Sequence, residues 1–530
     1  MTIHFEQIRY RYPSTNSDTW NVSIDSFSIQ PGEFVLLIGS SGAGKSTFLR
    51  ILQGLIPDFY GGLLQIHSLN HTFNSGFVMQ DPEQQIIMPD VLGELVFGME
   101  QLGFSRKEMD RRLEHVQSWL PVQSWQNREV QTLSTGEKQR LLIGAISLTD
   151  PDLFILDEPI AHLDVQCIQK LTTLVRDWIS NKKHSLIVAD HRIEHWLPLA
   201  TRVIMMDKGS IIWDGSVDHW FDFAVNSIFW RDWLPLTKRA TAMSITEENQ
   251  LKPKQSKLKN KPIDDIHINR LTCAYENNEI ILNNIQSILR SNSLTALFGP
   301  NGSGKSTFLR ALAGLITPIQ GTIQLQSGLD LTNWSPAERS RWFGYVSQNP
   351  YDHLIHDSIS KELDYSISLM GLDRSLEQGR FDQICDALEL SSNILNAHPR
   401  DLSSGERHRA ALATVLIRRP LLLLMDEPTS GLSIRQKNQF VSWLISYRES
   451  GGTALISSHD LDFTAEWANH VWLLQSSGTR DYIQLTEYDA ERLFKSPGLY
   501  QSSLVPLTGH YQLTQAVQYL RSQKKGRDQQ

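Results

Sequence analysis

Two glycine-rich stretches decide the fold of this chain: GSSGAGKS at residues 39–46 and GPNGSGKS at residues 299–306. Both fit the pattern G-x-x-x-x-G-K-[ST], whose backbone N–H groups cradle phosphates. At ordinary glycine usage the pattern arises by chance in about 2% of chains of this length, so coincidence is a poor explanation for two copies. The chain is therefore a duplicated phosphate-binding protein.

Each glycine loop is expected between a buried strand and a helix. Short apolar runs at residues 34–38 and 294–298 enter the loops and predict strands. Residues 46–50 and 306–310 open amphipathic helices whose N-termini face the loops. The order of strand, loop and helix is the context that phosphate binding requires.

Length and composition favour two large folded domains in a reducing compartment. A chain of 530 residues is too long for one core. Its formal net charge of −8 leaves no general basic footprint, so we expect no nucleic-acid partner. Three scattered cysteines, Cys167, Cys273 and Cys385, lack the spacing of a zinc site or a disulfide framework, which favours the cytosol.

Neither a membrane span nor a secretory leader is evident in the sequence. No apolar run reaches the roughly 18 residues that cross a bilayer, and the first residues lack the basic and apolar progression of a leader. We therefore expect any membrane role to depend on a partner. Residues 244–262 are lysine-rich and polar and include Pro253 and Pro262, which predicts a flexible basic linker.

Two further apolar runs end in paired carboxylates, Asp157-Glu158 and Asp426-Glu427. The first acid of each pair is suited to hold Mg²⁺ through water, and the second to polarise the water that attacks a γ-phosphate. Such a strand alone is weak evidence for a site. Together with the glycine loops, the pairs predict two sites for MgATP.

The loops supply the remaining phosphate and magnesium contacts. Lys45 and Lys305 are expected to reach the β- and γ-phosphates, and Ser46 and Ser306 to ligate magnesium. The ion would bridge those phosphates, and water would fill most of its octahedral shell.

At this point the chain resembles the ATPase subunits of ATP-binding cassette (ABC) proteins, over residues 1–240 and 263–490. LSTGEKQR at 133–140 and LSSGER at 402–407 resemble the family signature, with Thr135 and Ser404 in place of a glycine. A small hydroxyl residue still lets the helix N-terminus approach a phosphate, so we expect reduced or tuned activity at worst.

The resemblance implies a fold and a domain organisation. The fold class is α/β, with two P-loop NTPase domains of ABC ATPase type, each with a mainly parallel RecA-like core sheet, an antiparallel β-subdomain and a helical signature subdomain. The expected domains are residues 1–243 and 263–490. The linker 244–262 joins them, and a C-terminal helical extension and tail follow at 491–530.

The resemblance also implies the site residues. The catalytic residues would be Glu158, Glu427, His191 and His459, where the histidines match the switch histidine of the family. The magnesium contacts would be Ser46, Gln80, Asp157, Ser306, Gln348 and Asp426. The nucleotide contacts in the first half would be Tyr12, Gly39, Ser40, Ser41, Gly42, Ala43, Gly44, Lys45, Ser46, Thr47, Gln80, Ser134, Gly136 and Asp157. Those in the second half would be Tyr275, Gly299, Pro300, Asn301, Gly302, Ser303, Gly304, Lys305, Ser306, Thr307, Gln348, Ser403, Gly405 and Asp426.

In this family two halves pair so that each phosphate loop faces the signature of the other half. Site one would therefore add Ser403 and Gly405, and site two would add Ser134 and Gly136. Here both halves lie in one chain. Tyr12 and Tyr275 stand where the family stacks an aromatic ring on adenine, although packing within the β-subdomain is an alternative for each.

One departure from the family pattern predicts unequal sites. The D-loop aspartate is present as Asp164, but Ser433 replaces it in the second half. Because that loop crosses to the opposite site, Ser433 would lie beside site one. Both carboxylate pairs and both histidines remain, so we predict two hydrolysing sites of unequal rate.

Several stretches resemble the ATPases of energy-coupling factor (ECF) transporters, importers of vitamins and metal ions. They are GLIPDFYGG at 54–62, DPEQQ at 81–85, VFGME at 96–100 and, more loosely, NPYDH at 349–353. The resemblance implies an importer ATPase at the cytoplasmic face of a bacterial-type cell membrane. Its partners would be a transmembrane coupling subunit and a small substrate-binding membrane subunit. A thiamine-related compound is one candidate for the substrate.

Other interpretations stay open at the level of sequence. The same stretches are also compatible with ordinary packing in the helical subdomain. A soluble ribosome-associated tandem ATPase usually has a long charged helical linker, whereas the linker here is short and contains proline. A fused sugar-importer ATPase often has one eroded catalytic half, whereas both halves are complete here. A DNA-repair protein of this fold would commonly carry cysteine clusters.

Overall fold

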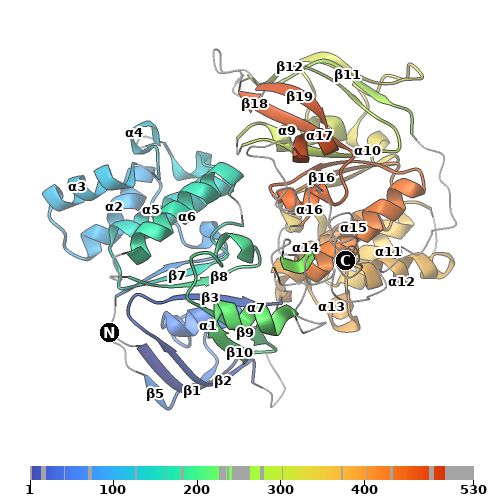
Figure 1. Ribbon diagram of the computed structural model, residues 1–530. Helices are drawn as coiled ribbons and strands as arrows, with labels where there is room; N and C mark the ends of the chain where they lie inside the picture. The colour runs from blue at the N-terminus through green and yellow to red at the C-terminus, as the bar shows by residue number, and fades with distance from the viewer. Residues whose placement is uncertain are drawn as a thin grey trace, which may run out of the picture. The chain divides into compact units, whose positions relative to one another are not determined.

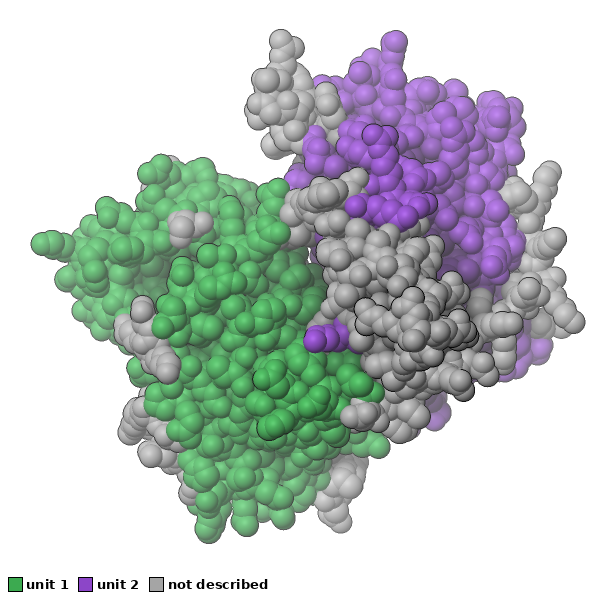
Figure 2. Space-filling model, in the orientation of Figure 1, with its two compact units in different colours: residues 1–235 green, residues 236–530 purple. Residues whose placement is uncertain are grey.

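The computed structural model divides the chain into two compact units, residues 1–235 and 236–530 (Figure 2). We describe each unit by itself. The residues that the structure describes are 3–13, 20–40, 42–69, 74–117, 119–125, 128–161, 163–180, 184–225, 234, 238–240, 263–274, 280–300, 302–371, 374–402, 404–429, 432, 434–476 and 483–495.

The first unit is built on a six-stranded sheet with the order β10-β9-β3-β8-β7-β6. Its strands are β3 (Phe34–Gly39), β6 (Ser75–Val78), β7 (Leu153–Asp157), β8 (Ser185–Ala189), β9 (Arg202–Asp207) and β10 (Ser210–Ser216). All neighbours are parallel except β9 and β10. Strands β3, β7 and β8 are buried along their whole length, as parallel strands between two helical layers are.

An antiparallel sheet lies beside this core. It contains β1 (Ile3–Arg11), β2 (Val22–Ile29), β4 (Leu63–Gln65) and β5 (Ser68–Leu69). Its apolar face packs on the helix that follows the glycine loop, where the Phe27 and Phe48 rings meet edge to face with centroids 5.1 Å apart. This packing fixes the position of the loop between the two sheets.

The helices of the first unit fall into a group around the core and a separate group. Around the core lie α1 (Lys45–Leu52), α6 (Val165–Ser180), η3 (Ile193–His195) and α7 (Val217–Val225). The separate group contains η1 (Pro82–Gln84), α2 (Val91–Gln101), α3 (Arg106–Val116), α4 (Val122–Trp125), η2 (Val130–Thr132) and α5 (Thr135–Leu148). In Figure 1 the helices α2–α5 and the strands β1, β2 and β5 lie at opposite ends of the unit.

The second unit repeats this topology. Its main sheet has the order β15-β16-β17-β13-β18-β19, which matches β6-β7-β8-β3-β9-β10 strand for strand. The strands are β13 (Leu294–Phe298), β15 (Phe343–Val346), β16 (Leu422–Asp426), β17 (Thr453–Ser457), β18 (His470–Ser476) and β19 (Ile483–Asp489). The antiparallel sheet contains β11 (Ile266–Ala274), β12 (Ile280–Leu289) and β14 (Gln320–Leu325).

The helices of the second unit follow a similar order along the chain, with α10 between β14 and β15 as an addition that has no counterpart in the described part of the first unit. They are α9 (Lys305–Ala313), α10 (Pro336–Arg339), η5 (Pro350–His353), α11 (Ile359–Ser368), η6 (Arg374–Leu376), α12 (Gln378–Ala387), α13 (Ser392–Asn396), η7 (Pro399–Asp401), α14 (Ser404–Leu416), α15 (Ile434–Glu449), α16 (Leu461–Ala465) and α17 (Ala490–Lys495). The core sheet, antiparallel sheet and helical group predicted from the sequence are thus present in both units.

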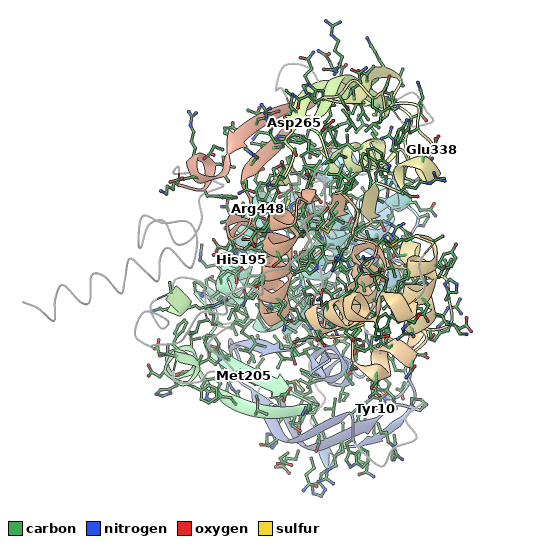
Figure 3. The ribbon with its side chains drawn as sticks, turned by 90° about the vertical axis from the view of Figure 1, so that its right-hand side faces the viewer. Tyr10, His195, Met205, Asp265, Glu338 and Arg448 are labelled. Atoms are coloured by element: carbon green, nitrogen blue, oxygen red, sulfur yellow. The ribbon has the colours of Figure 1, made fainter. Side chains whose placement is uncertain are left out.

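Side-chain contacts join neighbouring segments within each unit. Asp265, at the start of the β11 region, accepts hydrogen bonds from Arg290 Nη1 at 3.0 Å and Ser291 N at 2.7 Å (Figure 3 labels Asp265). In the first unit the indole N–H of Trp220 lies 3.1 Å from the sulfur of Met205, which is also labelled there. The predicted linker and most of the predicted tail lie outside the described residues, so those boundaries stay predictions.

Candidate functional site

The topology brings the predicted motifs of each half to one sheet edge. In the first unit β6, β7, β8 and β3 are parallel neighbours. Gly39 ends β3, Asp157 ends β7, and Gln80 and His191 follow β6 and β8 closely. Ligands of open α/β sheets bind at this carboxyl edge. The corresponding strands of the second unit carry the second set of motifs in the same order.

The glycine loops hold their lysines in the same way in both halves. Lys45 Nζ donates to the carbonyl oxygens of Gly39 at 2.7 Å and Ser40 at 3.0 Å. Lys305 Nζ donates to Gly299 O at 2.9 Å and Pro300 O at 3.1 Å. Burial lowers the pKa of Lys45, an effect that the nearby carboxylates oppose. Each ammonium group is therefore held against the first two residues of its own loop.

Backbone geometry explains why glycine is needed in these loops. Gly42 and Gly302 have φ values of 78° and 79°, which side chains rarely adopt, and a Cβ atom there would face open space. Glycine at these positions permits the close approach through which backbone N–H groups can cradle a phosphate group. The helices α1 and α9 begin directly after the loops, so their N-termini point at the same place.

The first carboxylate pair lies beside this loop. Asp157 is buried and accepts a hydrogen bond from Ser46. Burial, together with the neighbouring Glu158, raises the pKa of Asp157 to about 6. One oxygen of the carboxylate, Oδ1, is buried and has no hydrogen-bond partner in the described part of the chain. Such an orphaned acceptor fits a site for a hydrated cation.

Glu158 is held from two sides. Gln80 Nε2 donates to Glu158 Oε2 at 3.0 Å, and His191 Nε2 lies 3.2 Å from Glu158 Oε1. Three residues predicted from separate motifs therefore meet at one carboxylate. A general base needs an oriented carboxylate of this kind within reach of water.

The second half holds its glutamate with different partners. His459 Nε2 lies 3.3 Å from Glu427 Oε1, and the backbone N–H of His459 donates to Glu427 Oε2 at 3.3 Å. Asp426 is buried, whereas Gln348 is exposed. Glu427 and His459 therefore lie in contact, whereas Gln348 is more exposed than its counterpart Gln80, which is half-buried.

Both glutamates adopt a left-handed backbone conformation. The φ values are 48° at Glu158 and 49° at Glu427. A non-glycine residue in this region is uncommon and costs about 1–3 kcal/mol, so it persists where the surrounding fold enforces it. Because both halves show the same conformation at the same position, the fold around each carboxylate pair enforces this backbone geometry.

The loops that carry the histidines are anchored differently in the two halves. Asp190, beside His191, accepts a hydrogen bond from Trp196 Nε1 at 2.9 Å. Asp460, beside His459, pairs with Lys437 Nζ at 2.6 Å. Lys437 lies on α15, so in the second half an ion pair joins that helix to the histidine loop.

The two signatures lie at helix N-termini as expected. Ser134 caps α5 through a reciprocal capping box with Glu137, and Gly136 is buried in the first turn. The helix α14 begins at Ser404, and Gly405 is buried likewise. The contact of each signature with the loop of the other half stays a prediction. Five residues singled out from the sequence lie outside the described residues: Ser41, Tyr275, Asn301, Ser403 and Ser433.

Tyr12 lies next to the loop region of the first half. Its hydroxyl oxygen is 2.8 Å from Thr47 Oγ1 on α1, and its ring meets Tyr10 edge to face at 4.9 Å. The side chain is half-buried. The predicted stacking on adenine stays a prediction.

Sequence reasoning missed two buried glutamates near the segments that follow Gln80 and Gln348. Glu94 Oε2 accepts hydrogen bonds from the backbone N–H groups of Ile87 at 3.0 Å and Met88 at 2.8 Å. Glu362 does the same for residues 355 and 356, both at 2.8 Å. The signal that was available is their identical placement in the two halves, each before a leucine.

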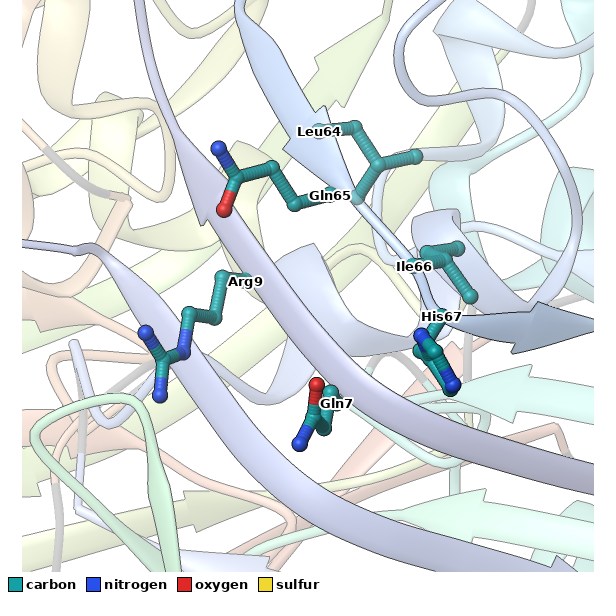
Figure 4. A pocket seen from close by; sticks show the side chains of 6 residues that line it. All are labelled: Gln7, Arg9, Leu64, Gln65, Ile66 and His67. Carbon is teal, nitrogen blue, oxygen red and sulfur yellow. The ribbon is translucent and has the colours of Figure 1, made fainter.

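A hollow of about 420 Å³ lies on the antiparallel sheet of the first unit (Figure 4). Its lining residues are Gln7, Arg9, Leu64, Gln65, Ile66 and His67. It lies where β1 stops pairing with β5 and starts pairing with β4. Gln7, with φ of 50°, lies on β1 between these two paired segments. None of the lining residues belongs to the motifs. Within the described ranges no group of three or more His, Cys, Asp or Glu side chains forms a metal site.

Comparisons with known proteins identify relatives of both halves. The model of the family described as ABC transporter matches residues 22–161 and 282–430. A Bacillus subtilis protein, provisionally named HMP/thiamine import ATP-binding protein YkoD, is 30% identical over 480 residues, which cover 86% of each chain. A Methanosarcina mazei protein, provisionally named an ABC transporter ATP-binding protein, is 29% identical over 545 residues, covering 93% of this chain and 90% of that protein.

Solved structures share the fold at lower identity. The structure titled "RNase-L Inhibitor" gives a TM-score of 0.62 at 18% identity and covers 92% of both chains. The structure titled "Model of ribosome-bound archaeal Pelota and ABCE1" gives 0.65 at 17% identity, covering 92% of this chain and 79% of that one. At these identities the likeness shows the tandem fold alone. No helix among the described residues combines the length and apolar character needed to cross a bilayer.

Proposed function

Because this chain belongs to the ABC transporter family and carries its ATPase domain twice, we propose that it is the ATP-hydrolysing subunit of an ECF-type importer. The chain itself is a P-loop ATPase that uses ATP with Mg²⁺. The observation that carries the importer assignment is the similarity of both halves to a Bacillus subtilis protein with an HMP/thiamine import name. The cargo would be a vitamin, with a thiamine-related pyrimidine as first candidate, or a metal ion.

The geometry of the first half supports a specific division of roles. Magnesium, when bound, neutralises charge on the phosphates. Ser46 and Asp157 would hold the ion, with Gln80 at its edge, and Lys45 would bind the β- and γ-phosphates. Glu158 would accept the proton of the attacking water, because His191 and Gln80 hold its carboxylate in place.

The second half would work with the corresponding residues Ser306, Asp426, Lys305, Glu427 and His459. We further propose that each site is completed by the signature of the other half. Site one would then include Ser403 and Gly405, and site two Ser134 and Gly136. In both cases a helix N-terminus would bring partial positive charge to the γ-phosphate.

An exposed isoleucine in each half supports a docking role for the segment after the glutamine. Ile87 is 66% exposed and Ile355 is 76% exposed, although both are strongly apolar. The carboxylates of Glu94 and Glu362 hold the backbone of these residues in place, so the exposure is fixed by the fold. A rigid apolar side chain on the surface is typical of a protein–protein contact. We propose that cytoplasmic helices of the transmembrane coupling subunit bind here.

The test is a mild-detergent pull-down of the tagged Glu158→Gln, Glu427→Gln double variant with mass spectrometry of the retained proteins. We expect a transmembrane coupling subunit together with a small substrate-binding membrane protein. Adding Ile87→Glu and Ile355→Glu to this variant should abolish recovery of both membrane proteins. Matched controls, Ile212→Glu and Leu329→Glu, change exposed apolar residues elsewhere and should retain them.

Two other roles make different predictions in the same experiment. A ribosome-associated ATPase would retain ribosomal proteins without membrane proteins and would cosediment with ribosomes, which would overturn the importer assignment. A sugar importer would retain transmembrane subunits together with a separate sugar-binding protein. The membrane protein recovered with the coupling subunit would therefore also identify the class of cargo.

A further inference from the structure

The two halves differ at one buried position beneath their paired carboxylates. Ser457 ends β17 and is fully buried. Its hydroxyl donates to Asp426 Oδ1 at 2.6 Å and accepts from the backbone N–H of Glu427 at 3.0 Å. One side chain therefore ties both members of the carboxylate pair together.

The first half has a methyl group at this position. Ala189 ends β8 and pairs in register with Asp157, just as Ser457 pairs with Asp426. The backbone N–H of Glu158 donates to Ala189 O at 2.8 Å instead. A methyl group donates no hydrogen bond, and Asp157 Oδ1 has no partner in the described part of the chain. The difference of one oxygen atom thus changes how the carboxylate is held.

A hydrogen bond of this kind fixes the rotamer of a carboxylate. Bonds of the type O–H···O⁻ are short and about twice as strong as neutral ones. Carboxylates that contact a metal, directly or through water, depend on such supporting bonds, whose removal typically lowers metal affinity by about 10–100-fold. The second carboxylate is therefore oriented by Ser457 before magnesium binds, whereas the first has the hydrogen bond from Ser46 but no such support at Oδ1.

We propose that Ser457 is a positioning residue that prepares the second half for magnesium and nucleotide, and that Ala189 leaves the first half without this support. The inference rests on the proposed assignment of the two glycine loops as MgATP sites. It makes the halves unequal for a reason inside each half, independent of the Ser433 replacement. The second half should capture nucleotide at a magnesium concentration about 10-fold lower than the first, the lower end of the effect of such supporting bonds.

The experiment measures nucleotide capture, not turnover, in each half separately. The full-length Glu158→Gln, Glu427→Gln variant is photolabelled with 8-azido-ATP over a magnesium titration. After proteolysis, mass spectrometry assigns the label to residues 1–235 or 236–530. Ser457→Ala should raise the magnesium requirement of the second half about 10-fold, and Ser457→Thr should restore it. The first half should keep its own requirement in both variants.

The reciprocal variant protects the test against misfolding. Ala189→Ser adds a hydroxyl where none is present and should lower the magnesium requirement of the first half toward that of the second. The inference would be overturned if neither Ser457→Ala nor Ala189→Ser changed the magnesium requirement for labelling. It would also be overturned if either variant shifted the magnesium requirement of both halves equally. Lys305→Ala should abolish labelling of the second half. Labelling that survives Lys305→Ala would instead overturn the proposed nucleotide site itself.

Discussion

Lys138 on α5 pairs with Glu83 in the segment after β6, with 2.6 Å between Nζ and Oε1. In the second half Arg407 on α14 occupies the corresponding place, and its guanidinium lies over the Tyr351 ring, 4.4 Å from the centroid. Both contacts join the signature helix to the segment that follows the glutamine. One is an ion pair with a largely exposed carboxylate, whereas the other is a cation–π contact.

Salt should therefore affect the two helices differently. Exposed ion pairs contribute about 0.2–1 kcal/mol and are screened by salt. We expect roughly 0.5 M salt to speed amide hydrogen exchange in the first turn of α5 by about 2–5-fold, with little change in α14. Hydrogen exchange with mass spectrometry measures both helices in one sample. Lys138→Ala should remove the salt effect in α5, and equal salt effects in both helices would contradict the assignment.

The buried carboxylate of Glu94 should contribute strongly to stability. Glu94→Ala leaves the N–H groups of Ile87 and Met88 without their acceptor, at a cost of about 1–3 kcal/mol for each group that stays buried. Glu94→Gln keeps a carbonyl oxygen and should cost less. Denaturant unfolding of the full chain, followed through its first transition, gives the difference.

Glu100→Ala is the matched control for that experiment. Glu100 lies on the same helix, α2, but is exposed. Exposed substitutions of this kind usually change the free energy of unfolding by less than about 0.5 kcal/mol. If Glu94→Ala is no more destabilising than Glu100→Ala, the carboxylate does not hold the segment in place.

The sequence predicts the core of each half well because local signals agree there. The run at 34–38 is apolar at every position, which is typical of a short strand buried on both faces, and β3 covers the same residues. Glu94 gives no such signal, since a single glutamate in a helix is normally a solvated charge. The partner of Lys138 lies 55 residues away in sequence, so only the tertiary fold brings the pair together. Ser457 differs from Ala189 by one oxygen. Only the strand register, which places Ser457 opposite Asp426, shows that its hydroxyl contacts the carboxylate.

The three cysteines should resist modification in the folded protein. All three are buried, and burial raises the pKa of Cys167, Cys273 and Cys385 to about 11 from a usual 9.0. Below pH 9 a shift of this size lowers the thiolate fraction about 100-fold. We expect slow reaction with DTNB at pH 8 and fast reaction of three thiols after unfolding.

The same shift has a consequence for stability at high pH. Because the folded state holds these protons more tightly than the unfolded state, the thiols stabilise the fold fully below about pH 9, and this contribution is lost as the pH rises to about 11.

For the reaction with DTNB, Ile87→Cys provides an exposed thiol as a control and should react at once. Fast reaction of a native cysteine at pH 8 would show that the burial is not maintained in solution.

Hydrolysis should depend on both glutamates, and unequally. Glu158→Gln and Glu427→Gln preserve the shape of the side chain and remove the base, so each should lower turnover at its own site by about 10²–10⁴-fold. Gln80→Ala removes the donor to Glu158 Oε2 but leaves His191 in place, so we expect a loss of about 10-fold in kcat with little change in KM. Gln84→Ala, an exposed glutamine in the same segment, is the control. Because the two glutamates have different partners, the two single Glu→Gln variants should retain different residual rates of phosphate release. Identical residual rates would show that the sites are equivalent despite Ser457 and Ser433.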